Sequence, residues 1–414
     1  MDFQPKEYSP IICSFCGNDR WQAKKIIVGP GVFICDVCAR RYSEEIHNTQ
    51  RRRPRKLINA LTPHQIKERL DQHVIGQEAT KRALSVAVYN HYKRLAYGDA
   101  YDGVEIQKSN ILLIGPTGTG KTLLAQTLAG FLNVPFVMVD ATAYTQAGYA
   151  GEHVENMIQN LLQNADEEVK QACRGIIYID EVDKLAQKRP GVSGSRDVSG
   201  EGVQQALLKV LEGASVNVPL KGSRNYPRQA YFKVDTGNIL FICGGAFIGL
   251  EKIVTRRAGA RSIGFQSTTE GAAADATLEW LKLLQAEDLI QYGFIPEFIG
   301  RLPVVCTLHH LDEDDLIRIL TEPKNALIRQ YQFFFETHGV HLRVTDKALH
   351  AIARKALARR SGARGLRAVM EMLMLDLMYE VPSMADIAEC VIDEKVICNG
   401  DRPKLKFHAV RQLA

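Results

Sequence analysis

The sequence lacks any long apolar run and any segment that could direct secretion. Its most apolar stretch, Ile239 to Leu250, is too short and too rich in glycine to span a bilayer, which requires about 20 residues. Residues 1–5 contain no basic segment followed by an apolar core, as a secretory signal would. These absences predict a cytoplasmic protein with no membrane partner.

The sequence also lacks a strong charge of one sign, internal repeats and low-complexity tracts. Its net charge is +5 over 414 residues, whereas a nucleic-acid footprint is a concentrated basic patch, so no nucleic-acid partner is indicated. Residues 48–56 are strongly basic and are typical of a solvated linker, with a basic arm for nucleic acid as the alternative.

The nine cysteines do not follow the pattern of a disulfide framework. Two Cys-x-x-Cys pairs, Cys13 with Cys16 and Cys35 with Cys38, are separated by eighteen residues. Each pair can hold one edge of a tetrahedral metal, as in structural Cys₄ zinc sites, and a module this small needs the metal in order to fold. The alternative to zinc binding is that the two Cys-x-x-Cys pairs carry out redox chemistry. Four thiolates leave no open coordination position, so the zinc is expected to be structural.

Short apolar runs alternate with helical periodicity from Leu61 onward. The runs lack polar alternation and are rich in β-branched residues, which is typical of strands buried on both faces of a parallel sheet. They are Ile111–Ile114, Phe136–Val139, Ile176–Ile179 and Ile239–Ile242. Thr62 and Pro63 predict a helix start. The fold class is therefore α/β, a doubly wound parallel sheet.

Further along the chain, two apolar sets follow helical spacing: Val154, Met157, Ile158, Leu161, Leu162, and Val203, Ala206, Leu207, Val210, Leu211. Strands become rare after Leu308, and helices are expected over 312–335, 346–360 and 365–379. We predict a zinc module at 1–47, a basic linker at 48–61, a large domain at 62–308 and a small, mostly helical domain at 309–414.

A phosphate-binding loop, G-x-x-x-x-G-K-[ST], follows the first predicted strand and precedes a helix that continues from Leu123. It comprises Gly115, Pro116, Thr117, Gly118, Thr119, Gly120, Lys121 and Thr122. The glycines allow backbone N–H groups to surround phosphates, and the helix N-terminus adds partial positive charge. Lys121 is expected to reach the β- and γ-phosphates of ATP, and the Thr122 hydroxyl to ligate Mg²⁺.

Two carboxylates, Asp180 and Glu181, end the third predicted strand. Ligands bind at the carboxyl edge of such sheets, so these groups should face the phosphate loop. We expect Asp180 to hold the Mg²⁺ shell and Glu181 to activate the attacking water. An acidic pair serving only as a helix cap is the alternative.

Several further segments give the chain a resemblance to the ClpX family of hexameric AAA+ unfoldases. The resemblance covers nearly the whole chain and is carried by segments 74–77, 196–205, 296–301 and 362–367. It implies that Arg301 acts as an arginine finger in a neighbouring subunit of a homo-hexamer. It also implies that Arg364 contacts the nucleotide from the small domain, and that Val74 and Ile75 border the adenine.

The same resemblance implies contacts with substrate and with a peptidase. Tyr149 and Ala150 stand where the family has its main pore loop, and Arg196 and Val198 lie in its second pore loop. Ile263, Gly264 and Phe265 match the loop that docks on a ClpP-like peptidase. The implied partners are protein substrates, adaptors and that peptidase, and the zinc module is one that can dimerise.

The chain departs from the family pattern at three places. Ala150 replaces a larger aliphatic residue, and Arg224-Asn225-Tyr226 replaces a basic triplet with histidine in the substrate-entry loop. Cys243-Gly244-Gly245 ends a predicted strand without a polar residue, so no sensor-1 residue is assigned.

Three functional classes are compatible with a nucleoside-triphosphatase of this kind. The favoured one is an ATP-driven unfoldase and translocase that delivers proteins to a peptidase. A DNA-handling AAA+ protein is the second, although it would be expected to carry a wider basic footprint. A remodelling chaperone or regulatory paralogue without a peptidase is the third.

Overall fold

The computed structural model describes residues 12–19, 25–51, 61–97, 106–144, 153–186, 200–219, 231–259, 280, 282–359, 361–384 and 386–408, with the backbone alone described for 44–51 and 97. The chain divides into two compact units, Met1–Ala60 and Leu61–Ala414. No helix in these ranges is long and apolar enough to cross a membrane.

The first unit is a small hairpin followed by a helix. Strands β1 (Ile26–Gly29) and β2 (Val32–Cys35) pair antiparallel, and Gly31 turns the chain between them with a φ of +75°. Helix α1 (Asp36–Arg51) begins with an acidic residue, which suits the partial positive charge of a helix N-terminus. It continues four residues past the expected end of the module at residue 47.

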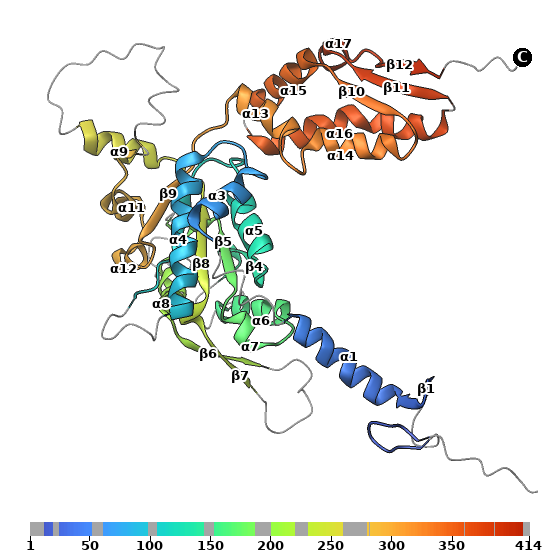
Figure 1. The fold of residues 1–414 in the computed structure, drawn as a ribbon. Coiled ribbons are helices and arrows are strands. Elements are labelled where there is room, and N and C mark those ends of the chain that lie inside the picture. The colour runs from blue at the N-terminus through green and yellow to red at the C-terminus, as the bar shows by residue number, and fades with distance from the viewer. Residues whose placement is uncertain are drawn as a thin grey trace, which may run out of the picture. The chain divides into compact units, whose positions relative to one another are not determined.

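A five-stranded parallel sheet forms the centre of the second unit (Figure 1). Its order is β4 (Phe136–Asp140), β5 (Ile176–Asp180), β8 (Leu240–Gly245), β3 (Ile111–Ile114) and β9 (Val304–Thr307). All neighbours are parallel, which confirms the predicted α/β class. Strands β3 and β8 are buried throughout, as expected from their continuous apolar sequence. The edge strand β9 was not predicted, because its residues are only partly buried.

Helices surround this sheet, and their starts follow from local sequence. The Thr62 side chain caps α3 (Pro63–Asp71) in a capping box with Gln65, with proline at the first helical position, as predicted. The expected apolar faces are buried on α6 (Glu155–Asn164) and α8 (Glu201–Glu212). The remaining helices are α4 (Glu78–Tyr97), α5 (Lys121–Leu132), α7 (Val169–Ala172), α9 (Leu250–Gly259), α11 (Ala286–Tyr292) and α12 (Pro296–Gly300).

An antiparallel hairpin, β6 (Ser215–Pro219) with β7 (Tyr231–Asp235), extends from the large α/β part. It was not predicted, although β6 alternates between exposed and buried residues as a half-buried strand does.

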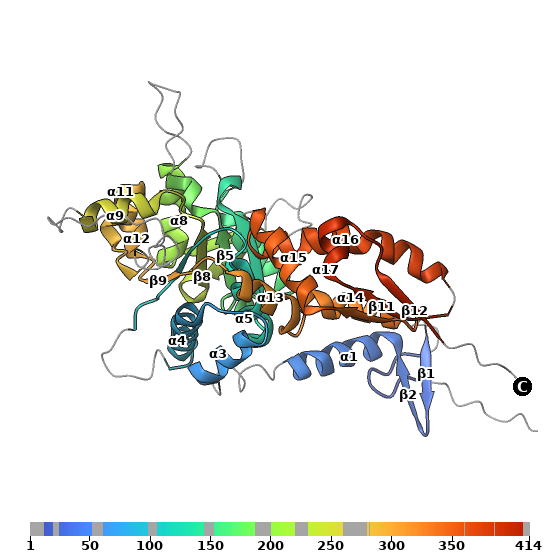
Figure 2. The same cartoon turned by 90° about the horizontal axis from the view of Figure 1, so that it is seen from above.

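The carboxyl-terminal region has its own apolar core and a second sheet beside its helices (Figure 2). Its helices are α13 (Glu313–Thr321), α14 (Leu327–Glu336), α15 (Asp346–Ala358), α16 (Ala363–Glu380) and α17 (Glu394–Asn399). Strands β10 (His341–Val344), β11 (Ile387–Ile392) and β12 (Lys404–Phe407) form a three-stranded sheet in that order.

The prediction of a single helix over 312–335 was wrong. The structure has two helices, α13 and α14, separated by a segment that contains Pro323. Proline has no N–H to donate and disfavours helical backbone before it, so the first helix ends just upstream. The region is mostly helical, as expected, but its sheet was not predicted.

Candidate functional site

The phosphate-binding loop joins β3 to α5 in a backbone conformation that requires glycine. Gly118 and Gly120 have φ values of +81° and +98°, in the left-handed region. A side chain on Gly115 would come within 2.7 Å of the Leu308 carbonyl oxygen. The loop therefore packs closely while leaving the free N–H groups at the start of α5 available for phosphate oxygens.

Lys121, the first residue of α5, is buried and folds back over this loop. Its Nζ donates hydrogen bonds to the carbonyl oxygens of Gly115 (2.5 Å) and Pro116 (2.9 Å). Burial lowers the pKa of Lys121, and the negative charges of Asp180 and Asp183 oppose that effect. The ammonium group is thus placed to exchange carbonyl partners for phosphate oxygens, which carry more negative charge.

Asp180 and Thr122 meet across the site although they are 58 residues apart in the sequence. The Thr122 Oγ1 donates a hydrogen bond to Asp180 Oδ2 at 3.3 Å. Parallel pairing brings the carboxyl ends of β5 and β3 to one edge of the sheet, with β8 between them. A hydroxyl and a carboxylate are the oxygen donors that Mg²⁺ takes from protein beside substrate phosphates, so these residues fit the metal.

Glu181 follows directly and adopts a left-handed backbone with a φ of +56°. Its N–H donates to Asp180 Oδ1 at 2.9 Å, and its side chain is exposed at the sheet edge. An exposed carboxylate beside the phosphate loop is available to accept a proton from water.

The N-terminus of α16 lies against the phosphate loop. The Ala363 N–H donates to the Gly118 carbonyl oxygen at 3.0 Å. A side chain on Gly362 would come within 2.9 Å of the carbonyl oxygens of Thr117 and Gly118, and its φ of +58° also favours glycine. Arg364 is exposed, and its charge adds to burial in lowering the pKa of Lys121. The structure thus brings the predicted Arg364 to the same site.

Val74 and Ile75 are buried beside the loop. Val74 Cγ1 lies 3.8 Å from the point where a Cβ on Gly120 would stand. Gln77 holds the segment in place, since its amide group donates to the His309 carbonyl oxygen (2.9 Å) and accepts from the His309 N–H (3.0 Å). Val74 therefore lies against the loop, and contact of Val74 and Ile75 with a base stays a prediction.

Arg301 is not brought to this site. Its backbone carbonyl accepts a hydrogen bond from Asn110 Nδ2 at 2.9 Å, and Asn110 immediately precedes β3. Arg301 therefore lies at the amino edge of the sheet, whereas the phosphate loop lies at the carboxyl edge. Its half-exposed guanidinium pairs with Glu212 at 2.8 Å.

Sequence reasoning missed two residues near the site, Tyr178 in β5 and Asp183 just after that strand. The Tyr178 hydroxyl donates to Asp180 Oδ1 at 3.2 Å. Asp183 is buried and accepts hydrogen bonds from the N–H groups of Ala246 (3.2 Å) and Phe247 (3.3 Å). For Tyr178 the sequence did offer a signal. Residues two positions apart in a strand face the same side of the sheet, so Tyr178 could have been expected on the side of Asp180.

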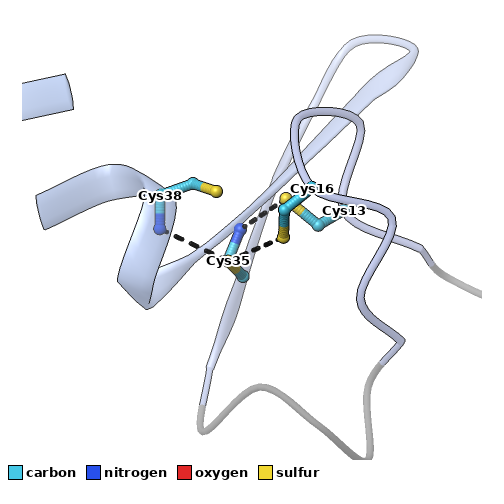
Figure 3. Close-up of side chains that lie close together, drawn as sticks. All are labelled: Cys13, Cys16, Cys35 and Cys38. Atoms are coloured by element: carbon cyan, nitrogen blue, oxygen red, sulfur yellow. Dashed lines mark hydrogen bonds between the residues drawn. The ribbon is translucent and has the colours of Figure 1, made fainter. Parts of the chain in front are cut away.

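A second site lies in the first unit, where four cysteine sulfur atoms converge (Figure 3). Their Sγ atoms all lie within 4.8 Å of one another, and Cys16 and Cys35 are separated by 3.6 Å. Tetrahedral zinc at a Zn–S distance of about 2.3 Å requires sulfur separations of about 3.8 Å, so the set fits the metal.

Backbone N–H groups support these sulfurs. The Cys35 N–H donates to Cys13 Sγ at 3.3 Å, and the Cys38 N–H donates to Cys35 Sγ at 3.4 Å. Such bonds orient the sulfurs toward a shared metal. Cys13, Cys35 and Cys38 are buried and Cys16 is exposed, which is the geometry of a structural site at the surface of a small module.

Comparisons with known proteins agree with this geometry. Residues 11–47 match the family model of the ClpX C4-type zinc finger, residues 106–305 that of the AAA domain (Cdc48 subfamily), and residues 311–393 that of the C-terminal, D2-small domain of ClpB protein. Over 400 residues the chain is 49% identical to the ATP-dependent Clp protease ATP-binding subunit ClpX of Treponema denticola, which covers 96% of each chain. The chain belongs to the ClpX family.

As a ClpX family member with an AAA domain, the protein is an ATPase and not itself a peptidase. ATP and Mg²⁺ are its cofactors at the phosphate loop, and Zn²⁺ is the metal of the four cysteines.

The pore and docking residues predicted from the ClpX family resemblance lie outside the described part of the chain. They are Tyr149, Ala150, Arg196, Val198, Ile263, Gly264 and Phe265. The triplet 224–226, which departs from the family pattern, also lies outside the described residues. Their roles remain predictions.

Proposed function

We propose that this protein is an ATP-driven unfoldase that pulls substrate proteins through a ring pore and delivers them to a ClpP-like peptidase. The main support for this proposal is the hydrogen bond from the Ala363 N–H, at the start of α16, to the Gly118 carbonyl oxygen. Because Gly118 belongs to the phosphate-binding loop, a change in the bound phosphates would act on this contact. Nucleotide turnover can therefore drive rigid-body motion of the carboxyl-terminal region.

At the nucleotide site each residue has a defined task in this proposal. Lys121 and the loop N–H groups bind the phosphates, Thr122 and Asp180 hold Mg²⁺, and Glu181 accepts a proton from the attacking water. Arg364 contacts the nucleotide of its own subunit. The bound Mg²⁺ neutralises charge on the phosphates.

Arg301 serves a neighbouring subunit. It lies beyond the amino end of β9, so the length of a strand separates it from its own phosphate loop. A guanidinium that cannot reach its own site, but projects half-exposed from the domain, suits the site of the next subunit in a closed ring. This placement supports a homo-hexamer of the AAA+ kind.

The partnership with a peptidase rests on the family and on sequence. The Treponema denticola relative is named as the ATP-binding subunit of the ATP-dependent Clp protease. We assign docking to Ile263, Gly264 and Phe265, substrate contact to the pore residues named above, and adaptor binding or dimerisation to the zinc module. We place the activity in the cytoplasm and retain the domain boundaries at residues 47, 61 and 308.

ATP hydrolysis in the presence of different polymers tests the proposed function. The purified protein should hydrolyse ATP faster when an unfolded protein substrate is added, and single-stranded DNA should leave the rate unchanged. The Lys121→Ala variant gives the background, because it lacks the phosphate-binding ammonium. Stimulation by DNA and not by protein would contradict the proposal and favour a DNA-handling motor.

A further inference from the structure

The end of strand β8, which lies beside the nucleotide site, carries no polar side chain apart from a thiol. Strand β8 lies between β5, which carries Asp180, and β3, which leads into the phosphate loop. The Gly115 N–H donates to the Gly245 carbonyl oxygen at 3.2 Å, so this strand end borders the phosphate loop directly. Cys243, Gly244 and Gly245 are all buried and contribute only backbone and a thiol.

The side chain of Tyr178 occupies the space that Gly244 leaves. Tyr178 pairs with Ile242 in the β5–β8 register, and Gly244 lies two residues further on the same face. A Cβ on Gly244 would overlap the Tyr178 hydroxyl and come within 2.8 Å of its ring carbon Cζ. Tyr178 is fully buried. The glycine therefore gives the tyrosine ring room to reach the carboxyl edge of the sheet.

At that edge the Tyr178 hydroxyl completes a set of donors around Asp180. It donates to Oδ1 at 3.2 Å, the Glu181 N–H donates to the same oxygen at 2.9 Å, and the Thr122 hydroxyl donates to Oδ2 at 3.3 Å. Both carboxylate oxygens are thus held, each by a hydroxyl from a different element.

The Tyr178 side chain is fully buried where its hydroxyl meets this carboxylate. A hydroxyl that donates to one oxygen of a carboxylate fixes the rotamer of that side chain.

We propose that Tyr178 is a positioning residue for Mg²⁺, acting through Asp180 from the space that Gly244 leaves at the end of β8. The inference rests on the proposed role of Asp180 in the Mg²⁺ shell. Removal of a group that orients a metal ligand commonly weakens metal binding or activity by about 10- to 100-fold.

The Tyr178→Phe variant removes one oxygen atom and keeps the ring that fills the sheet. Tyr92→Phe is the matched control, because Tyr92 is also buried and its hydroxyl donates to a backbone carbonyl, that of Arg174, at 3.1 Å. Binding of a fluorescent ATP analogue is measured with Mg²⁺ and with EDTA, and ATP hydrolysis is measured against Mg²⁺ concentration.

For Tyr178→Phe we expect the Mg²⁺-dependent gain in nucleotide affinity to fall about tenfold, with binding in EDTA unchanged and half-maximal hydrolysis displaced to about tenfold higher Mg²⁺. Tyr92→Phe should match the wild type in both measurements. A Gly244→Ala variant, which displaces the hydroxyl, should shift the Mg²⁺ profile in the same direction, and combination with Tyr178→Phe should add little further.

The Asp180→Asn variant distinguishes a failure of the proposed Mg²⁺ role of Asp180 from a failure of the proposed positioning role of Tyr178. If it shifts the Mg²⁺ profile and Tyr178→Phe matches Tyr92→Phe, the role of Asp180 stands and that of Tyr178 is overturned. If Asp180→Asn itself leaves the Mg²⁺ profile unchanged, the proposed role of Asp180 fails, and the inference about Tyr178 fails with it.

Discussion

Glu181 occupies a backbone conformation that residues with a side chain seldom adopt. Its φ of +56° interrupts the extended backbone of β5 immediately after Asp180. Such a conformation costs about 1–3 kcal/mol and persists only where the surroundings impose it. Here the Glu181 N–H is held by the Asp180 carboxylate, which keeps the exposed side chain at the sheet edge beside the phosphate loop.

Replacement of Glu181 by glutamine should separate binding from hydrolysis. Glu181→Gln keeps the size and backbone of the residue but cannot accept the proton of water, so we expect ATP binding to persist and hydrolysis to slow by about 10²- to 10⁴-fold. Equilibrium nucleotide binding and phosphate release measure the two steps. If Glu181→Gln hydrolysed ATP at the wild-type rate, Glu181 would not be the group that accepts the proton of the attacking water.

At the residue scale the sequence predicted those site residues that belong to one contiguous motif. Local spacing identified the loop from Gly115 to Thr122 and the two acids at the end of β5. The Tyr178–Asp180 and Ala363–Gly118 hydrogen bonds were not found. The first needs the space created by a glycine on the neighbouring strand, and the second depends on packing between residues 245 positions apart.

At the scale of elements the continuous apolar strands were predictable and the partly buried ones were not. Strands β3, β4, β5 and β8 coincide closely with the predicted runs. Strands β9, β10 and β12 contain few fully buried residues, and their position in a sheet is decided by tertiary packing rather than by sequence pattern.

The zinc unit provides a test of metal removal. Cys35→Ser removes one of the buried sulfurs, and structural zinc commonly supplies about 10–16 kcal/mol of apparent folding free energy in small modules. We expect loss of bound zinc and rapid proteolysis within residues 12–51. Basal ATP hydrolysis should change by less than about twofold, because residues 61–414 form a separate compact unit.

Zinc content, limited proteolysis and phosphate release measure these effects. The exposed Cys398→Ser serves as control, since it lies far along the chain from the zinc unit. A protein that retains stoichiometric zinc without Cys35 would contradict the four-sulfur site.

An ion pair between Arg257 and Asp288 joins helices α9 and α11. These helices flank residues 260–279, which include the predicted docking segment. Arg257 donates to both carboxylate oxygens of Asp288, at 2.7 and 2.8 Å, and also to the Leu283 carbonyl. Asp288 is fully buried, so loss of Arg257 leaves a buried charge without its partner.

We therefore expect Arg257→Ala to lower the free energy of unfolding, because the buried Asp288 carboxylate loses its charged partner. The neighbouring exposed Arg256→Ala should change it by less than about 0.5 kcal/mol. Burial raises the pKa of Asp288, but the bonds from Arg257 outweigh this and hold it below its usual value. The stabilisation is thus present at neutral pH and is lost only as pH falls through that lowered pKa.

Urea unfolding of the two arginine variants at neutral pH measures the difference. Equal midpoints for Arg257→Ala and Arg256→Ala would show that the pair contributes nothing. In assays with peptidase, Arg257→Ala should also weaken delivery of substrate to the peptidase more than it weakens ATP hydrolysis. The reason is that the helices on both sides of the docking segment lose the ion pair that joins them.

At the scale of the whole molecule, the role that we propose for Arg301 requires that a complete active site include two subunits. The phosphate loop follows β3, whereas Arg301 precedes β9, and these two strands are parallel neighbours. One chain therefore presents its nucleotide site at one edge of the sheet and its arginine at the other.

Mixing of two inactive variants tests this arrangement. Arg301→Ala and Glu181→Gln should each hydrolyse ATP at least 10²-fold more slowly than the wild type. When the two variants are co-expressed in equal amounts, roughly a quarter of the interfaces in a mixed ring combine an intact Glu181 from one subunit with an intact Arg301 from the next. We therefore expect roughly a quarter of the wild-type ATP hydrolysis to return. A mixture no more active than its components would place Arg301 outside the neighbour's site.

The most direct test of the central claim is degradation of a stably folded, tagged reporter by the purified protein and a ClpP-like peptidase. The account predicts that reporter is lost only when ATP and peptidase are both present, and that neither a non-hydrolysable analogue nor Glu181→Gln supports the loss. Reporter that stays folded and intact while ATP is hydrolysed, across a panel of terminal tags, would contradict it.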